Sequence, residues 1–217
     1  MPDVPADIFT EPDPSPDGLA NLGPLRPLAG LWQGDGGTDV SPKAPGPQTK
    51  RFTERLQMAV IAPQTNGPQL FHGLRDHIHI NDPDGAITFH DQVGYSLWEP
   101  GAGMILQSVT IPRGQALRAI GSAPRDDRNF SVMATRGETT SGIVSNPFLD
   151  EAFRTGHYSC AVTIHDNDSW SYEIHTHLKV KGHPGVFDHH DINTLRRIGP
   201  AVENPLEQIV RQGAAKG

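Results

Sequence analysis

The segment Phe52-Thr-Glu-Arg-Leu-Gln-Met-Ala-Val60 is the clearest indication of the fold, because apolar and polar side chains alternate along it. Leu56, Met58 and Val60 share one face with Phe52, and Glu54 is the charged side chain on that face. A repeat of two residues is typical of a β-strand that buries one face. The segment therefore predicts a half-buried strand that turns a single carboxylate toward the interior.

The same alternation recurs on both sides of this segment, in short runs separated by Gly, Pro, Asn and Asp. These runs predict strands over 70–80, 86–98, 104–111, 117–121, 129–135, 158–164, 172–180 and a stretch that ends at Ile198. Asn167-Asp168 lies between two of the runs and predicts the tip of a hairpin.

Two short helices are expected among the strands. One is predicted to follow Asn146-Pro147 and the other Asn204-Pro205, because asparagine caps a helix N-terminus and proline suits its first turn. Parallel strands need long crossover helices, which this sequence lacks. We therefore expect an all-β fold, an antiparallel up-and-down β-barrel of about ten strands with two short helices, similar to lipocalins and fatty-acid-binding proteins.

The chain divides into three parts by composition. Residues 1–21 are acidic and rich in proline, so we expect a flexible arm. The alternating pattern fills residues 22–199, the expected barrel domain, and residues 200–217 are expected to form a C-terminal tail with the second short helix. The single cysteine, Cys160, cannot form an internal disulfide and lies in an alternating run, which favours a buried structural thiol.

The charge pattern excludes several classes of partner. The formal net charge is −7, and no dense run of Lys or Arg supplies the basic stripe that binding to nucleic acid requires. No run of about 18 apolar residues is present to span a bilayer, and the acidic first residues are the opposite of a signal peptide. We expect a cytoplasmic protein that binds neither nucleic acid nor membranes.

Glycine alternates with larger residues in Gly30-Leu-Trp-Gln-Gly-Asp-Gly36. Alternate glycines remove the side chains from one face of a strand, which lets the backbone bend at a barrel corner or lets a flat ligand approach closely. From the residues alone both interpretations stay open. Trp32 is expected to fill one end of the barrel in the first of them.

Two groups of histidines are candidates for an interior site. His90 shares a strand face with Gln92, so the two side chains can form a polar spot inside the barrel, and a hydrogen-bonded or solvent-facing strand histidine is the alternative interpretation. His189 and His190 are adjacent, so at most one of them faces the interior, where a neutral imidazole is a common ligand for iron. Two surface histidines are the alternative interpretation of that doublet.

Other histidines form His-x-His pairs on single strand faces. His77 with His79, and His175 with His177, each begin a metal site of the non-haem kind. Neither pair is followed by the glutamate that would complete such a site, and we expect both pairs to face solvent. The sequence also contains no nucleophile elbow, phosphate-binding loop or dinucleotide-binding fingerprint.

The order of these motifs resembles the nitrobindin family, small haem-binding β-barrels that include the C-terminal domain of a human THAP-type protein. The resemblance spans roughly residues 22–199 and has four motifs: Gly-x-Trp-x-Gly-x-Gly, an aromatic-x-Glu strand, His-x-x-x-Gly-Tyr, and a closing strand with a histidine before a basic pair. The corresponding residues are Gly30, Trp32, Gly34, Gly36, Phe52, Glu54, His90, Gly94, Tyr95, His190, Leu195, Arg196 and Arg197.

The resemblance implies a haem b site inside the barrel. It makes His190 the iron ligand, or His189 if the register of the closing strand differs by one residue. It places six further residues around the haem: Trp32, Gly34, Gly36, Glu54, His90 and Tyr95. In that family ferric haem is linked to isomerisation of peroxynitrite to nitrate and to binding of nitric oxide, which implies a peroxynitrite isomerase without a catalytic side chain beyond the iron ligand.

The sequence also departs from the family pattern. Thr38-Asp-Val-Ser-Pro42 stands where the family's opening motif continues with glycine and Tyr-Pro. A second hypothesis therefore stays open, a non-catalytic protein whose cavity binds a fatty acid or another small apolar or planar ligand. The oligomeric state also stays open, a homodimer included.

Overall fold

The computed structural model describes residues 4–13, 15 and 17–203, and most of them lie in β-strands. The twelve strands are β1 (Gly30–Lys43), β2 (Gly46–Asn66), β3 (Gln69–Asn81), β4 (Thr88–Glu99), β5 (Met104–Ile111), β6 (Gln115–Ser122), β7 (Asn129–Thr135), β8 (Ile143–Ser145), β9 (Phe153–Ile164), β10 (Ser169–Val180), β11 (Phe187–Gly199) and β12 (Val202–Glu203). The described residues also contain a 3-10 helix, η1 (Gly23–Leu28), and an α-helix, α1 (Pro147–Ala152).

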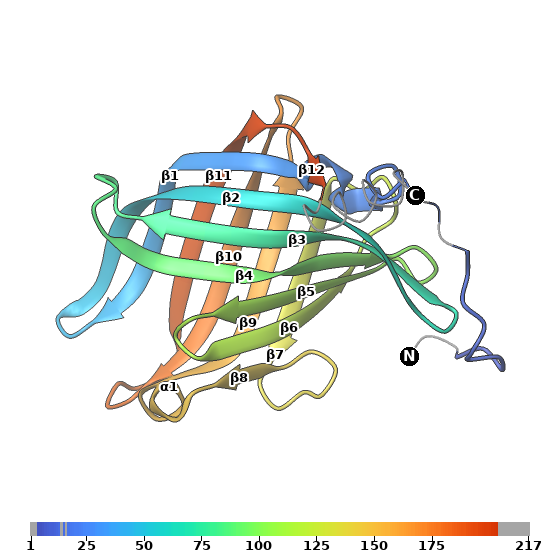
Figure 1. Cartoon of the computed structure of the whole chain (residues 1–217). Coiled ribbons are helices and arrows are strands. Elements are labelled where there is room, and N and C mark those ends of the chain that lie inside the picture. The colour runs from blue at the N-terminus through green and yellow to red at the C-terminus, as the bar shows by residue number, and fades with distance from the viewer. Residues whose placement is uncertain (1–3, 14, 16, 204–217) are drawn as a thin grey trace, which may run out of the picture.

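Ten of the strands form a closed antiparallel barrel (Figure 1). Each strand pairs with the next in the order β1, β11, β10, β9, β7, β6, β5, β4, β3, β2. The pairing of β1 with β2 closes the ring, with Gly30 opposite Met58 and Lys43 opposite Gly46. The short strand β8 pairs with β6, and β12 lies parallel to β2. The expected ten-stranded barrel is confirmed, and its closure satisfies the backbone groups that an open sheet would leave at its edges.

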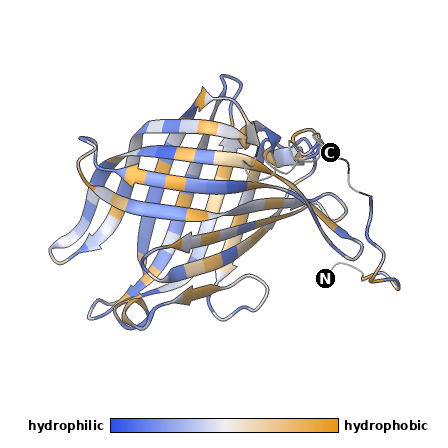
Figure 2. Ribbon diagram, viewed as in Figure 1, coloured by the Kyte–Doolittle hydropathy of each residue, from blue (hydrophilic) through white to orange (hydrophobic). Residues whose placement is uncertain are grey.

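The alternation of side chains along the strands accounts for the barrel's two faces. Figure 2 shows hydrophobic and hydrophilic residues following one another along single strands. In β2 the side chains of Phe52, Glu54, Leu56 and Met58 are buried, whereas Arg55 between them is exposed. The predicted inward face of this strand, its carboxylate included, is therefore confirmed.

The hairpin predicted at Asn167-Asp168 joins β9 to β10. Asp168 adopts a φ of 54°, a left-handed conformation that aspartate tolerates better than most residues. Its carboxylate accepts a hydrogen bond of 2.8 Å from Nε of Arg197 on β11. This contact links the tip of the hairpin to β11, the strand that pairs with β10.

An apolar plug closes one end of the barrel. It consists of Leu22, Leu25 and Leu28 in and beside η1, together with Trp32 and Trp98 from the barrel wall, and all five side chains are buried. η1 lies across this end in Figure 1. The indole N–H of Trp32 donates a hydrogen bond of 2.7 Å to the carbonyl oxygen of Leu28, which satisfies the polar atom of a buried aromatic ring.

The helices match the sequence in part. α1 begins where predicted, and the side chain of Asn146 caps it by accepting a hydrogen bond of 3.0 Å from the backbone N–H of Leu149. η1 was not expected, and the helix predicted after Asn204 lies outside the described residues. No helix among the described residues is long and apolar enough to cross a membrane.

Candidate functional site

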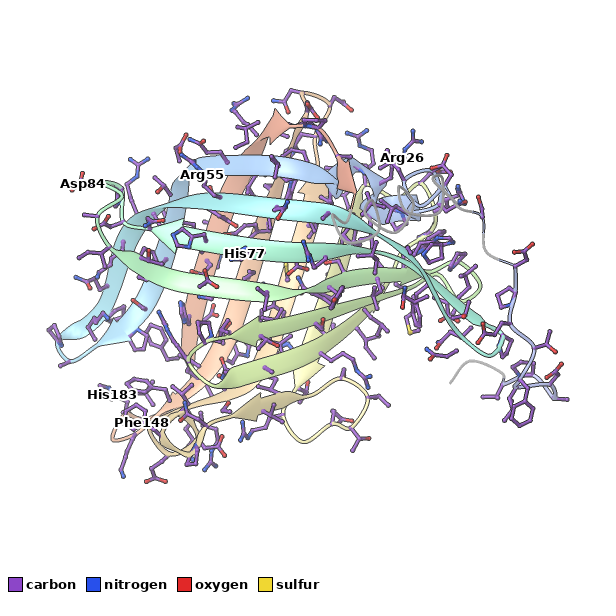
Figure 3. The ribbon with its side chains drawn as sticks, in the orientation of Figure 1. Arg26, Arg55, His77, Asp84, Phe148 and His183 are labelled. Carbon is purple, nitrogen blue, oxygen red and sulfur yellow. The ribbon has the colours of Figure 1, made fainter. Side chains whose placement is uncertain are left out.

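The half of the barrel away from the apolar plug is hollow. Its cavity has a volume of about 490 Å³, within the range of sites for small organic ligands. Leu25 and Leu28 line its floor, and Phe148 of α1 lines it at the opposite end, where this side chain is also largely exposed (Figure 3). The remaining walls are mostly apolar and aromatic, with the side chains of Phe89, Ile111 and Phe130 among them. The sequence expectation of a ligand-sized interior agrees with this cavity.

Three ionisable side chains meet on one wall of the cavity. Nε2 of His189 on β11 donates a hydrogen bond of 2.6 Å to Oδ1 of Asp39 on β1, and lies 3.4 Å from Oδ2 of Asp191. Burial acts to raise the pKa of Asp39, but the hydrogen bond and the charge of His189 lower it overall. Burial raises the pKa of Asp191 to about 7. This wall therefore offers an imidazole held between two carboxyl groups, that of Asp39 with a lowered pKa and that of Asp191 with a raised pKa.

The charge state of His189 follows from the same contacts. Burial acts to lower the pKa of His189, but the hydrogen bond with Asp39 and the charges of Asp191 and Asp39 raise it overall. The other ring nitrogen, Nδ1, forms no hydrogen bond with the described residues. A metal-bound imidazole typically keeps its second N–H on a carboxylate in this way, so His189 has the surroundings of a metal ligand.

The expectation that His190 faces the interior is wrong by one residue. Asn193 and Leu195 are buried on the inward face of β11, and strand alternation then turns His189 inward and His190 outward. His190 donates a hydrogen bond of 2.9 Å to Glu173 on the outer face of the barrel. Of the two histidines in the doublet, His189 is the one that lines the cavity.

Glu54 is a buried carboxylate in the wall of the cavity, 1% exposed. Its Oε2 accepts hydrogen bonds of 2.8 Å from the hydroxyl of Tyr172 and of 2.8 Å from Nδ2 of Asn193. Its Oε1 is buried without a hydrogen-bond partner among the described residues. Burial raises the pKa of Glu54, although both donors oppose that shift. The absence of a side chain at Gly34 makes room for Asn193, because a Cβ there would collide with the asparagine amide.

His90 lies where the sequence predicted, on the cavity wall. Its Nε2 donates a hydrogen bond of 3.3 Å to Oε1 of Gln92, its neighbour on the same face of β4. Burial lowers the pKa of His90, and the positive charges of Arg113 and His189 lower it further. The structure thus brings His90, whose pKa is lowered, into the same part of the cavity as His189, whose pKa is raised.

Gly34 does not line the cavity, and three further predicted contacts lie away from it. Trp32 belongs to the apolar plug, where it packs edge-on against Trp170 at 6.0 Å between ring centroids. Tyr95 is 45% exposed on the outer face of β4, because strand alternation turns it to the face opposite that of His90 and Gln92. Gly36 has open space around it, since a Cβ there would meet nothing closer than 4.0 Å. These three residues therefore do not line the ligand-sized space.

The sequence did not reveal three polar residues that line the cavity: Asp39, Asp191 and Arg113. Asp39 lies in the stretch from 38 to 42 that departs from the family pattern, and this departure was the available signal. Asp191 is two residues after His189 and follows it onto the inward face only once the strand register is known. Arg113 is in the turn between β5 and β6 and has no local pattern to mark it.

Comparisons with known proteins agree with this fold. Residues 21–197 match the family model described as "THAP4-like, heme-binding beta-barrel domain". This chain belongs to the THAP4-like haem-binding β-barrel family. The membership confirms the resemblance stated from the sequence motifs.

The crystal structure of Rv2717c from M. tuberculosis is similar to the structure of this THAP4-like chain. The two chains are 20% identical with a TM-score of 0.58, and the match covers 85% of this chain and 99% of that chain. At this identity the likeness shows the shared fold. Comparison with curated proteins finds no match.

The residues of this THAP4-like barrel fit a haem group. His189 presents an imidazole to an apolar cavity and has a carboxylate on one ring nitrogen. Lys43 and Arg113 line the end of the cavity opposite the plug, where they can pair with the two propionates of a haem. The apolar walls between these groups suit the face of a porphyrin.

Proposed function

We propose that this chain binds haem b in the cavity with His189 as the iron ligand, and that the ferric form isomerises peroxynitrite to nitrate. The proposal rests on one observation, an inward imidazole whose Nε2 is held by Asp39 at 2.6 Å inside a cavity of about 490 Å³. Membership of the THAP4-like haem-binding family supports it.

The chain's own residues would orient the ligand and exclude water. The hydrogen bond from Nε2 of His189 to Asp39 decides which ring nitrogen keeps the proton and leaves Nδ1 for the metal. His90 contributes a neutral imidazole as a hydrogen-bonding group on the cavity wall. Phe89 and Phe130 keep that wall apolar.

The reaction needs little more from the protein. Bound ferric haem supplies a Lewis-acidic iron centre. Peroxynitrite and nitrate contain the same atoms and carry the same charge, so the isomerisation requires no protein nucleophile, no reductant and no net transfer of a proton. The isomerisation therefore needs no proton transfer from the Glu54 carboxyl in the cavity wall.

Haem reconstitution of the two neighbouring histidine variants tests the ligand assignment. We expect wild-type protein and His190→Ala to show the same Soret band after addition of haem, because His190 lies on the outer face. We expect His189→Ala to lose the Soret band of bound haem or to shift it to the position of free haem. A Soret band unchanged in His189→Ala, or one lost in His190→Ala alone, would contradict the assignment.

The activity is tested separately from binding. Stopped-flow mixing of ferric protein with peroxynitrite is expected to speed its decay and to raise the yield of nitrate over nitrite, in wild type and His190→Ala alike. Haem-loaded protein that leaves both the decay rate and the product ratio unchanged would remove the isomerase part of the proposal and leave haem binding intact.

The shape of the cavity also supports a second candidate function. Its apolar walls run from Leu25 at the plug to Lys43 and Arg113 at the other end, an arrangement that also suits an acyl chain with a carboxylate. Displacement of a fluorescent fatty acid, together with no Soret band in any preparation, would favour a non-catalytic binding protein.

A further inference from the structure

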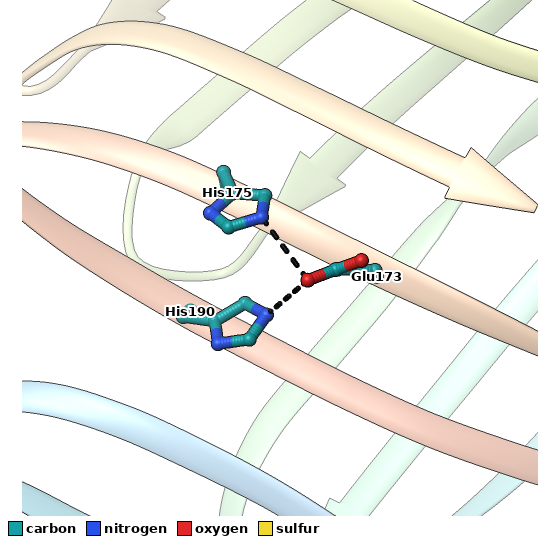
Figure 4. A group of neighbouring side chains, drawn as sticks. All are labelled: Glu173, His175 and His190. Atoms are coloured by element: carbon teal, nitrogen blue, oxygen red, sulfur yellow. Dashed lines mark hydrogen bonds and ion pairs between the residues drawn. The ribbon is translucent and has the colours of Figure 1, made fainter.

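Glu173, His175 and His190 form a compact cluster on the outer face of the barrel, away from the cavity (Figure 4). Oε1 of Glu173 lies 2.9 Å from Nε2 of His190 and 3.3 Å from Nε2 of His175. One ligand atom from each of the three residues lies within 4.8 Å of the others. From these contacts we propose that the three residues bind one divalent transition-metal ion of the zinc class.

The pairing of β10 with β11 fixes this arrangement. His175 and His190 are directly opposite each other in the antiparallel register, and Glu173 is two residues before His175 on the same face. The two imidazole rings stack with 4.5 Å between centroids and 11° between planes. Three ligands carried by two adjacent strands are held by the barrel's own hydrogen bonds, which lowers the entropy that a metal would otherwise have to offset.

A carboxylate behind His175 prepares that ring for a metal. Nδ1 of His175 donates a hydrogen bond of 2.8 Å to Oδ2 of Asp188 on β11. The proton on Nδ1 leaves the lone pair of Nε2 directed toward Glu173 and His190. Such carboxylate–histidine–metal arrangements are typical of protein metal sites, where the outer carboxylate orients the ring and raises its basicity.

The donor set indicates the class of ion. Two imidazole nitrogens and one carboxylate oxygen suit zinc and the neighbouring transition metals better than calcium or magnesium, which prefer oxygen alone. The side chains are 49% exposed for Glu173, 34% for His175 and 29% for His190. Solvent can therefore reach the centre, and water can fill the remaining coordination positions.

A second histidine group on the barrel provides a matched control. His77 and His79 on β3 lie 3.3 Å and 3.2 Å from Oδ2 of Asp91 on the outer face, where Figure 3 labels His77. Among the described residues, only the proposed site and the cavity group with His189 bring three ligand atoms within 4.8 Å of one another. The His77 group thus also has two histidines and a carboxylate on the outer face, but its three ligand atoms do not all lie within 4.8 Å of one another.

Metal titration of the full-length, haem-free and chelator-treated chain tests the proposal. Isothermal titration with Zn²⁺ and the visible absorption of Co²⁺ would report binding in wild type and in six variants: His190→Gln, Glu173→Gln, Asp188→Asn, His77→Gln and His189→Gln, with His175→Gln as the third ligand variant. We expect wild type, His77→Gln and His189→Gln to bind the ion at this site with equal affinity. We expect His190→Gln and Glu173→Gln to bind at least about tenfold more weakly, and Asp188→Asn to lose about tenfold or more through the orientation of His175.

The same experiment can overturn the proposal in three ways. Zinc uptake by wild type that is equal in His190→Gln and Glu173→Gln would place the ion elsewhere, and its loss in His189→Gln would place it in the cavity. No uptake of Zn²⁺ or Co²⁺ by wild type would leave the cluster as an ion pair. The thermal midpoint provides a check on folding, because zinc should raise it in wild type and His77→Gln but not in His190→Gln.

Discussion

Replacing Asp76 with asparagine removes an ionisable group from the interior of the barrel without changing its shape. Asp76 is 4% exposed on the inward face of β3, and its Oδ2 accepts a hydrogen bond of 3.4 Å from Ser96. Its Oδ1 is buried without a partner among the described residues. Burial raises the pKa of Asp76 to about 7, with the Ser96 hydrogen bond opposing the shift. The protein therefore folds most favourably when this carboxyl is protonated.

The pKa difference sets the size and the sign of the effect. In the unfolded chain Asp76 has the ordinary value of 3.8, so between about pH 4 and pH 7 the unfolded state releases a proton that the folded state keeps. The free energy of unfolding decreases as the pH rises through this window and is constant for this group above it. At about 1.4 kcal/mol for each pKa unit, the contribution is on the order of 3 kcal/mol between pH 4.5 and pH 8.

Urea unfolding of wild type and Asp76→Asn at pH 4.5 and pH 8 measures this contribution. Because other groups titrate equally in both proteins, the difference between the two free energies of unfolding should move by about 3 kcal/mol in favour of the variant as the pH rises. Asp84→Asn, which removes an exposed carboxylate from the turn after β3, should change by less than about 0.5 kcal/mol at either pH. A difference for Asp76→Asn that is the same at both pH values would refute the reasoning.

Three other changes have outcomes that the structure sets. Gly34→Ala should cost about 1–3 kcal/mol of the free energy of unfolding, because the new methyl collides with the amide that donates to Glu54, whereas Gly36→Ala, in open space, should be nearly neutral by the same urea measurement. Tyr172→Phe should lower the free energy of unfolding by about 1–3 kcal/mol, because its hydroxyl donates a hydrogen bond of 2.8 Å to the buried carboxyl of Glu54; an unchanged free energy of unfolding would contradict this role. Burial raises the pKa of the Cys160 thiol to about 12, so a thiol reagent should label it only after denaturant is added, and rapid labelling of native protein would show that the site opens.

Strand positions were largely predictable because one physical pattern encodes them. Alternation located 104–111 and 129–135 with the bounds of β5 and β7, and it turned His175 and His177 outward as observed. The cap at Asn146 located α1 for an equally local reason. The short strands β8 and β12, of three and two residues, contain too few positions for any alternation to be detected.

The site was less predictable because it depends on register and on contacts between distant strands. A shift of one residue exchanges His189 and His190 between the cavity and the outer face, and the choice follows from the burial of Leu195, which sequence alone does not give. Asp39 reaches His189 across 150 positions of the chain. No local spacing predicts such a pair.

The outer cluster shows the same limit from the other side. The sequence pairs His175 with His177, two residues apart on β10, and leaves that pair without a third ligand. The barrel instead places His190 directly across from His175 and brings Glu173 to both. A metal motif assembled across a strand boundary has no signature within either strand.

Because the apolar plug fills only one end of the barrel, the two ends of the barrel differ in how deeply their side chains are buried. Leu25 and Leu28 at the plug are buried in the hydrophobic core, whereas Phe148 and Arg113, which line the cavity at the other end, are exposed. Substitutions of Phe148 and Arg113 are therefore expected to change ligand binding with little loss of stability. Ligand preference can therefore be engineered at Phe148 and Arg113 while the residues of the apolar plug are kept.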